Sequence, residues 1–520
     1  MSWSEKKTRD RVDAHMEAMG EIEVLPLARQ VVDLEALLSE TSCRDVFGAH
    51  VYGAVTNFDT LSSDPTMKRE AYQRLIQTTH VYQREASRIA ESVFSGYRVH
   101  FQGSKVHVLF YRPINDEKKI AVQAVLFLLV LNDFVTNVFN AAFGDYPDWK
   151  IGGGADIGHA IGTRNGKRGE RELLFIGTPA NQAAKIIADR SSLRLTPAVW
   201  ASLPADLCAC CTQLASGNYK IAASRTTLQT LCSAHGIKWD SDASAARVTE
   251  DKASFPLKDI DYSDAEVPID FAGLGWKNSK RVTAASSFAD VSGFTQFVKD
   301  AEDRELQQEA LRFFHVVRTE LTKVASTDYD GVHVQFQGDR IETLVHLPKG
   351  DSAAIAVKAV EVAIGMQSSF EQVIKPEFPA ASALTLKIGI DLGTTLATRL
   401  GTRGDRDNVC LGTPVENAAA LEERCSGSTI GISKAVYDGL DGSDLQKHFV
   451  YESALECWVG RDLVWERLDA LEDEQSYSGG KGLAIGLGAA AAGAALAYVI
   501  SVAKSKDEPQ VQPSRTHADS

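Results

Sequence analysis

The sequence lacks the features that mark secreted, nucleic-acid-binding and disordered proteins. Its eight cysteines are scattered without the close spacing of a disulfide-linked domain, and no apolar signal-peptide core follows the N-terminal residues. Acidic residues outnumber basic residues by 69 to 55, and the net charge of −14 excludes a broad basic face for nucleic acid. We therefore expect a globular protein of a reducing cytoplasm that binds no nucleic acid.

The chain does have enough apolar sequence for more than one core. It is 520 residues long, with 44% hydrophobic and 24% charged residues, which predicts two or three domains. An acidic chain can still hold a small nucleotide, because bound Mg²⁺ and a few local Lys or Arg side chains offset its charge. The composition therefore permits a nucleotide enzyme.

One long segment near the C-terminus carries no charge. It runs from Gly482 to Ala503, between Lys481 and Lys504, and as a helix it would span about 30 Å, one bilayer core. Because it is rich in Ala and Gly, a buried or low-complexity helix is the alternative. We expect a single-pass membrane helix, and the spacing of Gly482 and Gly486 would let two such helices pair in a homodimer.

The strongest pattern is an internal repeat. Residues 99–113 match residues 334–348, and residues 158–179 match residues 393–414, with the same offset between the members of both pairs. Chance would not keep one offset over two separate blocks. A repeat this long indicates a duplicated domain and not a solenoid, whose units are roughly 20–50 residues long.

Each copy of the repeat shows the order β, α, ββ, α, β. In the second copy, Phe313, Val317, Leu321 and Val324 recur near helical spacing, and Gly338 marks the turn of the hairpin that follows. Strands that alternate with helices around a hairpin predict an α+β sandwich of the ferredoxin-like kind.

The repeat and the shifts in composition divide the chain. The expected parts are an N-terminal segment (1–40), a first copy (41–205), a spacer rich in Asp, Ser and Ala (206–280), a second copy (281–440), an extension and linker (441–481), the membrane helix (482–503) and a polar tail (504–520).

Two carboxylates of the second copy stand where strands are expected to end. Asp290 ends a strand that runs into Gly293, and Asp339 follows Gly338 in the hairpin turn. Carboxylates in ones and twos, completed by phosphates and water, are how Mg²⁺–nucleotide sites are built. Each residue alone has an ordinary alternative, because Asp290 suits a helix cap and Asp339 suits a turn.

Four blocks of the second copy resemble the class III adenylate and guanylate cyclases. The blocks are FADVSGFT at 288–295, QGD at 337–339, IGIDLG at 388–393 and GTPV at 412–415. The resemblance implies two ferredoxin-like cyclase domains that form an intramolecular head-to-tail pair. It also implies two Mg²⁺ or Mn²⁺ ions, bound by Asp290 and Asp339.

The first copy departs from this pattern at both aspartates. Aligning GAHVYGAV at 48–55 with FADVSGFT at 288–295 puts His50 at the position of Asp290, with five extra residues in the first copy before the next block. The offset of the main repeat puts Ser104 at the position of Asp339. The first copy is therefore expected to bind no metal.

The losses in the two copies are complementary. In the family, the partner domain supplies an Asn and an Arg one helical turn apart, and the first copy has Asn181 and Lys185 at these positions. The second copy has Glu416 and Ala420 instead. The resemblance thus implies one catalytic site, with both aspartates facing Asn181 and Lys185. Lys185 is a departure, because an ammonium cannot make the bidentate contact of a guanidinium.

The activity that the resemblance implies is a phosphorus–oxygen lyase reaction within one nucleoside triphosphate. The ribose 3′-hydroxyl attacks the α-phosphorus and expels pyrophosphate, which leaves a 3′,5′-cyclic nucleotide. Asn181 would orient the ribose, and Lys185 would stabilise the charge that develops on the phosphate oxygens.

The positions that read the base match neither purine pattern of the family. Purine cyclases carry Lys or Glu where the first copy has His100 and the second has Gln335, and Asp or Cys where the first copy has Leu174. The pyrimidine cyclases of bacterial antiphage (Pycsar) systems are similar in their unusual base pockets. We therefore expect UTP, or CTP, as the substrate.

This resemblance also implies a setting. The cyclic nucleotide would act on an unknown effector in antiviral defence, and the catalytic domains would lie on the cytoplasmic side of the bacterial inner membrane. Two alternatives stay open: an ordinary adenylate or guanylate cyclase with an altered pocket, and a catalytically inactive nucleotide-binding scaffold.

A basic loop recurs in both copies of this acidic chain. Its residues are Arg164, Arg168 and Arg171 in the first copy, and Arg399, Arg403 and Arg406 in the second. One set would meet the triphosphate, and the alternative is a solvated face of a hairpin.

Overall fold

The protein is described here by a computed structural model, which covers residues 2–28, 33–62, 68–165, 172–187, 192–300, 304–402 and 405–468. Met1–Trp465 form one compact unit that holds both copies. A second unit, Glu466–Ser520, is described only as far as residue 468. The predicted membrane helix, Gly482–Ala503, lies outside the described residues.

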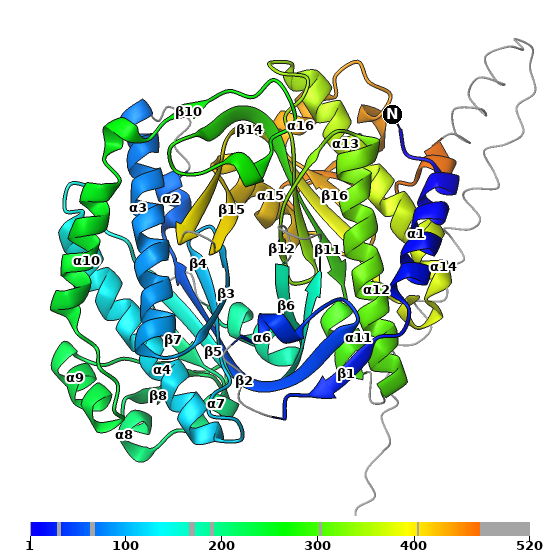
Figure 1. The fold of residues 1–520 in the computed structure, drawn as a ribbon. Coiled ribbons are helices and arrows are strands. Elements are labelled where there is room, and N and C mark those ends of the chain that lie inside the picture. Colours follow the sequence, from blue (N-terminus) through cyan, green and yellow to red (C-terminus); the bar gives the residue numbers. More distant parts are fainter. Residues whose placement is uncertain are drawn as a thin grey trace, which may run out of the picture. The chain divides into compact units, whose positions relative to one another are not determined.

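Each copy is built on one mixed β-sheet (Figure 1), and the two sheets share one strand order. The order is β3-β4-β2-β5-β7-β9-β8 in the first copy and β12-β13-β11-β14-β16-β18-β17 in the second. The strands of the first copy are β1 (Glu23–Pro26), β2 (Ser42–Val55), β3 (Tyr97–Gln102), β4 (Lys105–Phe110), β5 (Ile151–Asn165), β6 (Glu172–Ile176), β7 (Leu193–Leu195), β8 (Cys211–Gln213) and β9 (Tyr219–Ile221). Those of the second are β10 (Tyr262–Ser263), β11 (Ser279–Ser292), β12 (Val332–Gln337), β13 (Arg340–Val345), β14 (Thr385–Thr402), β15 (Asp405–Leu411), β16 (Thr429–Ile432), β17 (Val450–Glu452) and β18 (Cys457–Arg461). The repeat in the sequence is therefore a repeat of two α+β units.

Two long helices pack against each sheet, and the second helix of each pair begins at an equivalent cap. Asp116 accepts a hydrogen bond from Lys119 N at 3.0 Å, and Asp351 accepts one from Ala354 N at 2.9 Å. The long helices are α3 (Arg69–Arg88), α4 (Glu117–Asp133), α12 (Arg304–Lys323) and α13 (Ser352–Ser368). Shorter helices are α1 (Glu5–Met19), α2 (Phe58–Ser62), α6 (Thr178–Lys185), α7 (Pro197–Ala201), α8 (Ala205–Cys208), α9 (Arg225–Ala234), α10 (Ser241–Ser254), α11 (Phe294–Asp300), α15 (Thr413–Arg424) and α16 (Lys434–Gly439).

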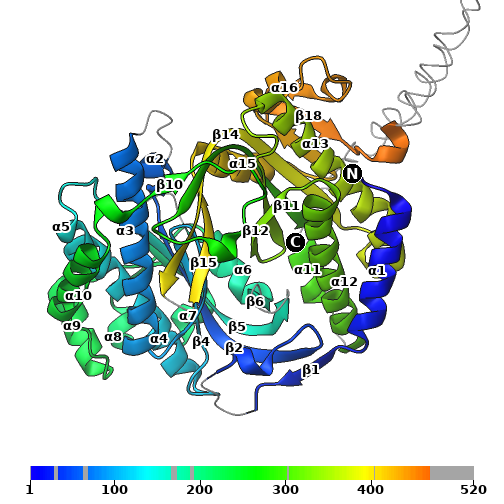
Figure 2. The same ribbon diagram turned by 45° about the horizontal axis from the view of Figure 1, so that its top comes forward.

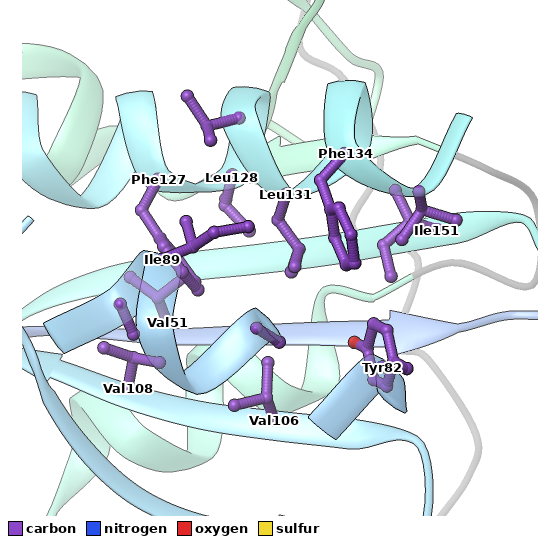
Figure 3. Close-up of a cluster of buried hydrophobic side chains, with 14 of the residues drawn as sticks. Val51, Tyr82, Ile89, Val106, Val108, Phe127, Leu128, Leu131, Phe134 and Ile151 are labelled. Carbon is purple, nitrogen blue, oxygen red and sulfur yellow. The ribbon is translucent and has the colours of Figure 1, made fainter. Parts of the chain in front are cut away.

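The most apolar helices form the cores of the two copies. Figure 3 shows Phe127, Leu128 and Leu131 of α4 above Val51 of β2 and Val106 of β4. By length and hydropathy alone, Glu117–Ala142 and Ser352–Glu377 could cross a membrane, but their most apolar stretches are 78% and 72% buried inside the protein. These two stretches are core helices.

Residues 206–280, expected to be a spacer, complete the first copy instead. β8 and β9 extend its sheet beyond β7, and α10 packs on α3. Each of these two strands spans three residues, too few to show the alternation by which a strand is predicted. The spacer prediction is therefore wrong for most of this segment.

A hairpin of the second copy packs into the core of the first copy. Leu396 and Leu400 of β14 and Val409 of β15 are fully buried in the same cluster as the side chains of α3 and α4. Figures 1 and 2 show this hairpin, in yellow, beside α3, in blue. Apolar side chains of one copy thus complete the core of the other.

Two equivalent histidines, one in each copy, form hydrogen bonds to a β-hairpin of the other copy. His80 in α3 accepts a hydrogen bond from Gly401 N at 3.2 Å, across the copies. His315, at the equivalent position of the repeat in α12, shares a hydrogen bond of 2.9 Å with Thr163 of β5. Each copy therefore holds the hairpin of the other at the same place in its fold.

The N-terminal segment also joins the two copies. α1 packs on α12 of the second copy (Figures 1 and 2), while β1 pairs in parallel with β2 of the first. Arg11 donates to Glu320 Oε2 and to Asp328 Oδ1, each at 2.9 Å, and both acceptors are buried. Because these carboxylates have a charged partner, their burial costs less free energy.

The crossing hairpin can be tested by stability. Leu400→Ala is expected to lower the free energy of unfolding by about 2–5 kcal/mol, because it leaves a cavity in the first copy's core. Chemical denaturation of the purified protein measures this difference. Val450→Ala, at a side chain that is 66% exposed, is the control and should change stability by less than about 0.5 kcal/mol. Equal effects of the two substitutions would show that the hairpin does not pack in this core.

Candidate active site

Asp290 lies at the end of β11, where the strand leads into α11 through Gly293. Gly293 has a φ of +90°, a left-handed conformation that favours a residue without a Cβ. Opposite Asp290 in β14 stands Lys387, whose Nζ lies 3.5 Å from Asp290 Oδ2. Lys387 also lies 2.6 Å from Glu422 Oε1, so its charge is shared between two carboxylates.

Asp339 lies in the turn between β12 and β13, after Gly338, which has a φ of +73°. Burial and the negative charge of Asp290 raise the pKa of Asp339 well above its ordinary value. The two carboxylates are thus close enough to repel each other, and a cation between them would relieve this repulsion.

The donor set fits a hard divalent cation. The described ranges contain no group of three or more His, Cys, Asp or Glu side chains suited to a metal. Two carboxylates completed by phosphate oxygens and water are nevertheless the ordinary ligands of Mg²⁺ at a nucleotide, and Mn²⁺ accepts the same ligands. Asp290 and Asp339 are therefore the residues that would hold such ions.

α6 of the first copy brings Asn181 and Lys185 to this edge of the second copy. Asn181 Nδ2 donates to Thr295 Oγ1 of α11 at 2.5 Å. The positive charge of Lys185 acts to lower the pKa of Asp339, against the larger effects of burial and Asp290. Asn181 and Lys185 share a face of α6 because they are four residues apart. The four residues that meet here, which we call the aspartate site, are Asp290, Asp339, Asn181 and Lys185.

The pairing of β2 corrects the residue expected at the place of Asp290. Ala54 pairs with Gly152 of β5 as Asp290 pairs with Lys387 of β14, and Gly152 and Lys387 are equivalent in the main repeat. Ala54 therefore occupies the position of Asp290, and the assignment of His50 is wrong. The sequence misleads because both blocks contain Val-x-Gly, which aligns four residues out of register. With the register corrected, the first copy has one extra residue before the next block and not five.

The opposite half of the interface holds no such carboxylate pair. We call it the opposite site; it comprises Ala54, Ser104, Glu416 and Ala420. Ser104 is buried, and burial and then the charge of Arg340 lower the pKa of the neighbouring Lys105. Glu416 and Glu423 of α15 act in the other direction on Lys105. Neither Ala54 nor Ser104 can supply a carboxylate to a metal.

The residues predicted to read the base lie in two places. His100 in β3 and Leu174 in β6 belong to strands of the first copy that contact each other, and Leu174 is buried. Gln335 lies at the equivalent position of the second copy, where it donates to Glu342 Oε2 at 3.0 Å. Burial raises the pKa of Glu342 to about 7. Gln335 therefore already has a partner within the second copy.

The basic loop is only partly described. Arg164 forms an ion pair of 3.0 Å with Glu35, and Arg399 Nε donates to Arg406 O at 3.3 Å within the β14–β15 hairpin. Arg168 and Arg403, which were also predicted to meet phosphate, lie outside the described residues. Arg164 and Arg399 thus contact a side chain and a backbone carbonyl of the protein itself, and neither a phosphate role nor a solvated hairpin face follows from these contacts.

Sequence reasoning missed three residues of the aspartate site's surroundings, namely Lys387, Glu422 and Thr295. Lys387 is opposite Asp290 only because β11 and β14 pair, and no local pattern announces that pairing. Glu422 joins Lys387 to Arg340, with an ion pair of 2.9 Å to the latter. This network links α15 to β13, which follows the turn that holds Asp339, and to β14, whose Lys387 faces Asp290.

Known proteins resemble this chain in sequence and in structure. The family model described as the adenylate and guanylate cyclase catalytic domain matches residues 277–462. A uridylate cyclase of Pseudomonas aeruginosa is 28% identical over 457 residues, which cover 84% of this chain and 86% of that protein. A uridylate cyclase of a Rhizobium species is also 28% identical, over 82% of each chain.

A solved structure extends this similarity over both copies. The crystal structure of a class III adenylyl cyclase-like ATP-binding protein from Pseudomonas aeruginosa matches with a TM-score of 0.77 and 25% identity, over 91% of this chain and 100% of that one. Catalytic domains of this family generally use divalent metal ions. Residues 277–462 thus match the catalytic-domain model of the adenylate and guanylate cyclases, and the similarity to class III cyclases extends over both copies.

Proposed function

We propose that the protein converts UTP to 3′,5′-cyclic UMP and pyrophosphate at the aspartate site. The observation that carries this proposal is the meeting of the two copies, in which α6 of the first copy lies against the carboxylates of the second. The names of the two curated relatives, both uridylate cyclases, support a pyrimidine substrate. Leu174 supports it too, because an apolar side chain cannot make the polar contact that reads a purine in this family.

The residues of the aspartate site divide the work of the reaction. Divalent ions bound at Asp290 and Asp339 would supply Lewis acidity, which makes the ribose 3′-hydroxyl more acidic and offsets the phosphate charge. Asn181, held by Thr295, would donate to the ribose and align its 3′-hydroxyl with the α-phosphorus. Lys185 would hold its positive charge beside the α-phosphate oxygens as negative charge grows there.

A second candidate is a nucleotide-binding protein that uses ATP. It is favoured by the solved neighbour, which is described as adenylyl cyclase-like and ATP-binding. In that case the aspartate site would bind ATP with its metal ions, and uridine nucleotides would bind weakly.

One assay separates these candidates. The purified protein is incubated with Mn²⁺ or Mg²⁺ and with each of the four labelled NTPs, and products are identified by chromatography and mass spectrometry. Cyclic UMP from UTP, with a kcat/KM at least about tenfold above that for any other NTP, is the expected result. Cyclic AMP formed from ATP alone would show that the substrate is ATP and not UTP, and the aspartate site would still be the proposed place of the reaction. The absence of any cyclic product, while ATP binds, would exclude the cyclase reaction and leave the second candidate.

A further inference from the structure

A row of polar rings lies on one face of the first copy's sheet, at the predicted base-reading position. His100 of β3 pairs across the sheet with His107 of β4, and His107 pairs with Tyr52 of β2. The rings of His107 and Tyr52 stack with centroids 4.2 Å apart, and those of His107 and His100 meet edge to face at 5.3 Å. His100 is therefore supported by packing, which holds its ring in one orientation.

His100 is a neutral ring with one proton at physiological pH. Burial lowers its pKa to about 3, and the positive charges of Arg98, Arg318 and Lys105 act in the same direction. A neutral imidazole carries one N–H donor and one bare nitrogen acceptor. The nitrogen that bears the proton therefore decides whether His100 can donate to a base or only accept from it.

Gln102 determines this choice. Its side-chain nitrogen, Nε2, lies 2.9 Å from His100 Nε2. An amide nitrogen only donates, so His100 Nε2 accepts this hydrogen bond and carries no proton. The single ring proton is thus on Nδ1, which becomes a hydrogen-bond donor.

The neighbouring histidine pair cannot make the same choice. His50 Nδ1 and His107 Nε2 lie 3.0 Å apart, and both rings are buried and neutral because burial lowers both pKa values. Either ring can donate to the other, so this pair has two tautomeric arrangements, and the contact between the rings selects neither of them. His100 differs from this pair, because the side-chain nitrogen of Gln102 can only donate and therefore fixes the tautomer of His100.

We propose that Gln102 is a positioning residue that holds His100 with its proton on Nδ1, so that the site accepts a base with an oxo group and rejects one with an amino group. This inference rests on the proposed function and deepens it. Uracil presents an oxo group at C4, whereas cytosine presents an amino group there, as adenine does at C6. Two donors that face each other leave both without an acceptor, and a buried donor left unpaired destabilises the complex.

The test reverses the tautomer. A carboxylate only accepts, so in Gln102→Glu the His100 Nε2 must donate, and Nδ1 becomes an acceptor. The ratio of kcat/KM for UTP to that for CTP is expected to fall at least about tenfold, measured near about pH 8.5, where a histidine beside a carboxylate is still neutral. In Gln102→Leu, which leaves both tautomers accessible, the ratio should fall by an intermediate amount.

Two measurements distinguish a change of the His100 tautomer from general damage to the structure. In ¹⁵N-histidine NMR of the full chain, with His100 assigned from His100→Asn, wild type should show a protonated Nδ1 and Gln102→Glu a protonated Nε2. In a His100→Asn background, Gln102→Glu should leave the UTP to CTP ratio unchanged, because the coupling runs through His100.

The outcomes distinguish this inference from the proposed function. If wild type makes cyclic UMP but Gln102→Glu keeps the wild-type ratio and tautomer, the role of Gln102 is overturned and the function stands. If Gln102→Glu does not fold, an unchanged ratio in Gln102→Leu overturns it in the same way. If wild type uses GTP instead of UTP, the proposed base is wrong, and a fall in the GTP to ATP ratio in Gln102→Glu would still support the tautomer inference.

Discussion

Asp339→Asn is expected to lower kcat on the order of a thousandfold, the loss typical when a group that stabilises transition-state charge is removed. Asparagine keeps the shape of the side chain but loses its negative charge, and that charge is what a divalent cation binds. Cyclic nucleotide formation at saturating UTP and Mn²⁺ measures this effect. The variant should be at least as stable as wild type, because it removes the repulsion from Asp290.

The first copy supplies the matched control. Ser104 lies at the equivalent turn, between β3 and β4, and Ser104→Ala is expected to retain activity within about twofold, because the opposite site has no carboxylate pair. A large loss in Ser104→Ala, or an Asp339→Asn variant that keeps a tenth or more of wild-type kcat, would place the reaction elsewhere.

Lys185→Ala is expected to lower kcat about a hundredfold with a smaller change in KM, because its charge is needed most as the α-phosphate oxygens become more negative. Lys185→Arg should retain most of the activity, since a guanidinium carries the same charge and is the usual group in this family. The two parameters are obtained from initial rates over a range of UTP concentrations.

The effect of Lys185 should also depend on the second copy's carboxylates. If both act in one composite site, adding Lys185→Ala to Asp339→Asn should cost much less than the two separate losses combined. Glu416→Ala, at the opposite site, should leave kcat within about threefold of wild type. Independent effects in the double variant would mean that Lys185 acts outside the aspartate site.

Much of the fold can be predicted from the sequence because the duplicated domain shows the same sequence pattern twice. Two blocks at one offset were enough to predict two equivalent α+β units, and the structure has the same strand order in both. The strands of three residues, β8 and β9, carry no periodicity, so the segment that holds them was mistaken for a spacer. Local pattern alone cannot detect a strand that is defined by its neighbours.

The site was predictable where a residue lies in a motif and unpredictable where pairing alone places it. Asp290, Asp339, Asn181 and Lys185 lie in blocks that resemble a family, and the structure brings these blocks together. Lys387 was missed because it faces Asp290 across two strands far apart in the sequence.

The error at His50 has a related cause. A strand tolerates a shift of four residues without a change of face, because its side chains alternate with a period of two. His50 and Ala54 therefore satisfy the same hydrophobic pattern, and the hydrogen-bond register with β5 decides between them.

The N-terminal helix α1 imposes an order on the folding of the two copies during synthesis. α1 precedes both copies in the sequence and leaves the ribosome before them, yet Arg11 contacts Glu320 and Asp328, 309 and 317 residues later. Contacts between such distant residues form late, because closing a long loop costs chain entropy before any contact repays it. The first copy therefore cannot complete its fold before the second copy is made. α1 needs α12 of the second copy to pack against, and the core of the first copy needs the β14–β15 hairpin. A nascent chain that holds only the first copy would expose the apolar side chains that the β14–β15 hairpin covers, until the second copy emerged.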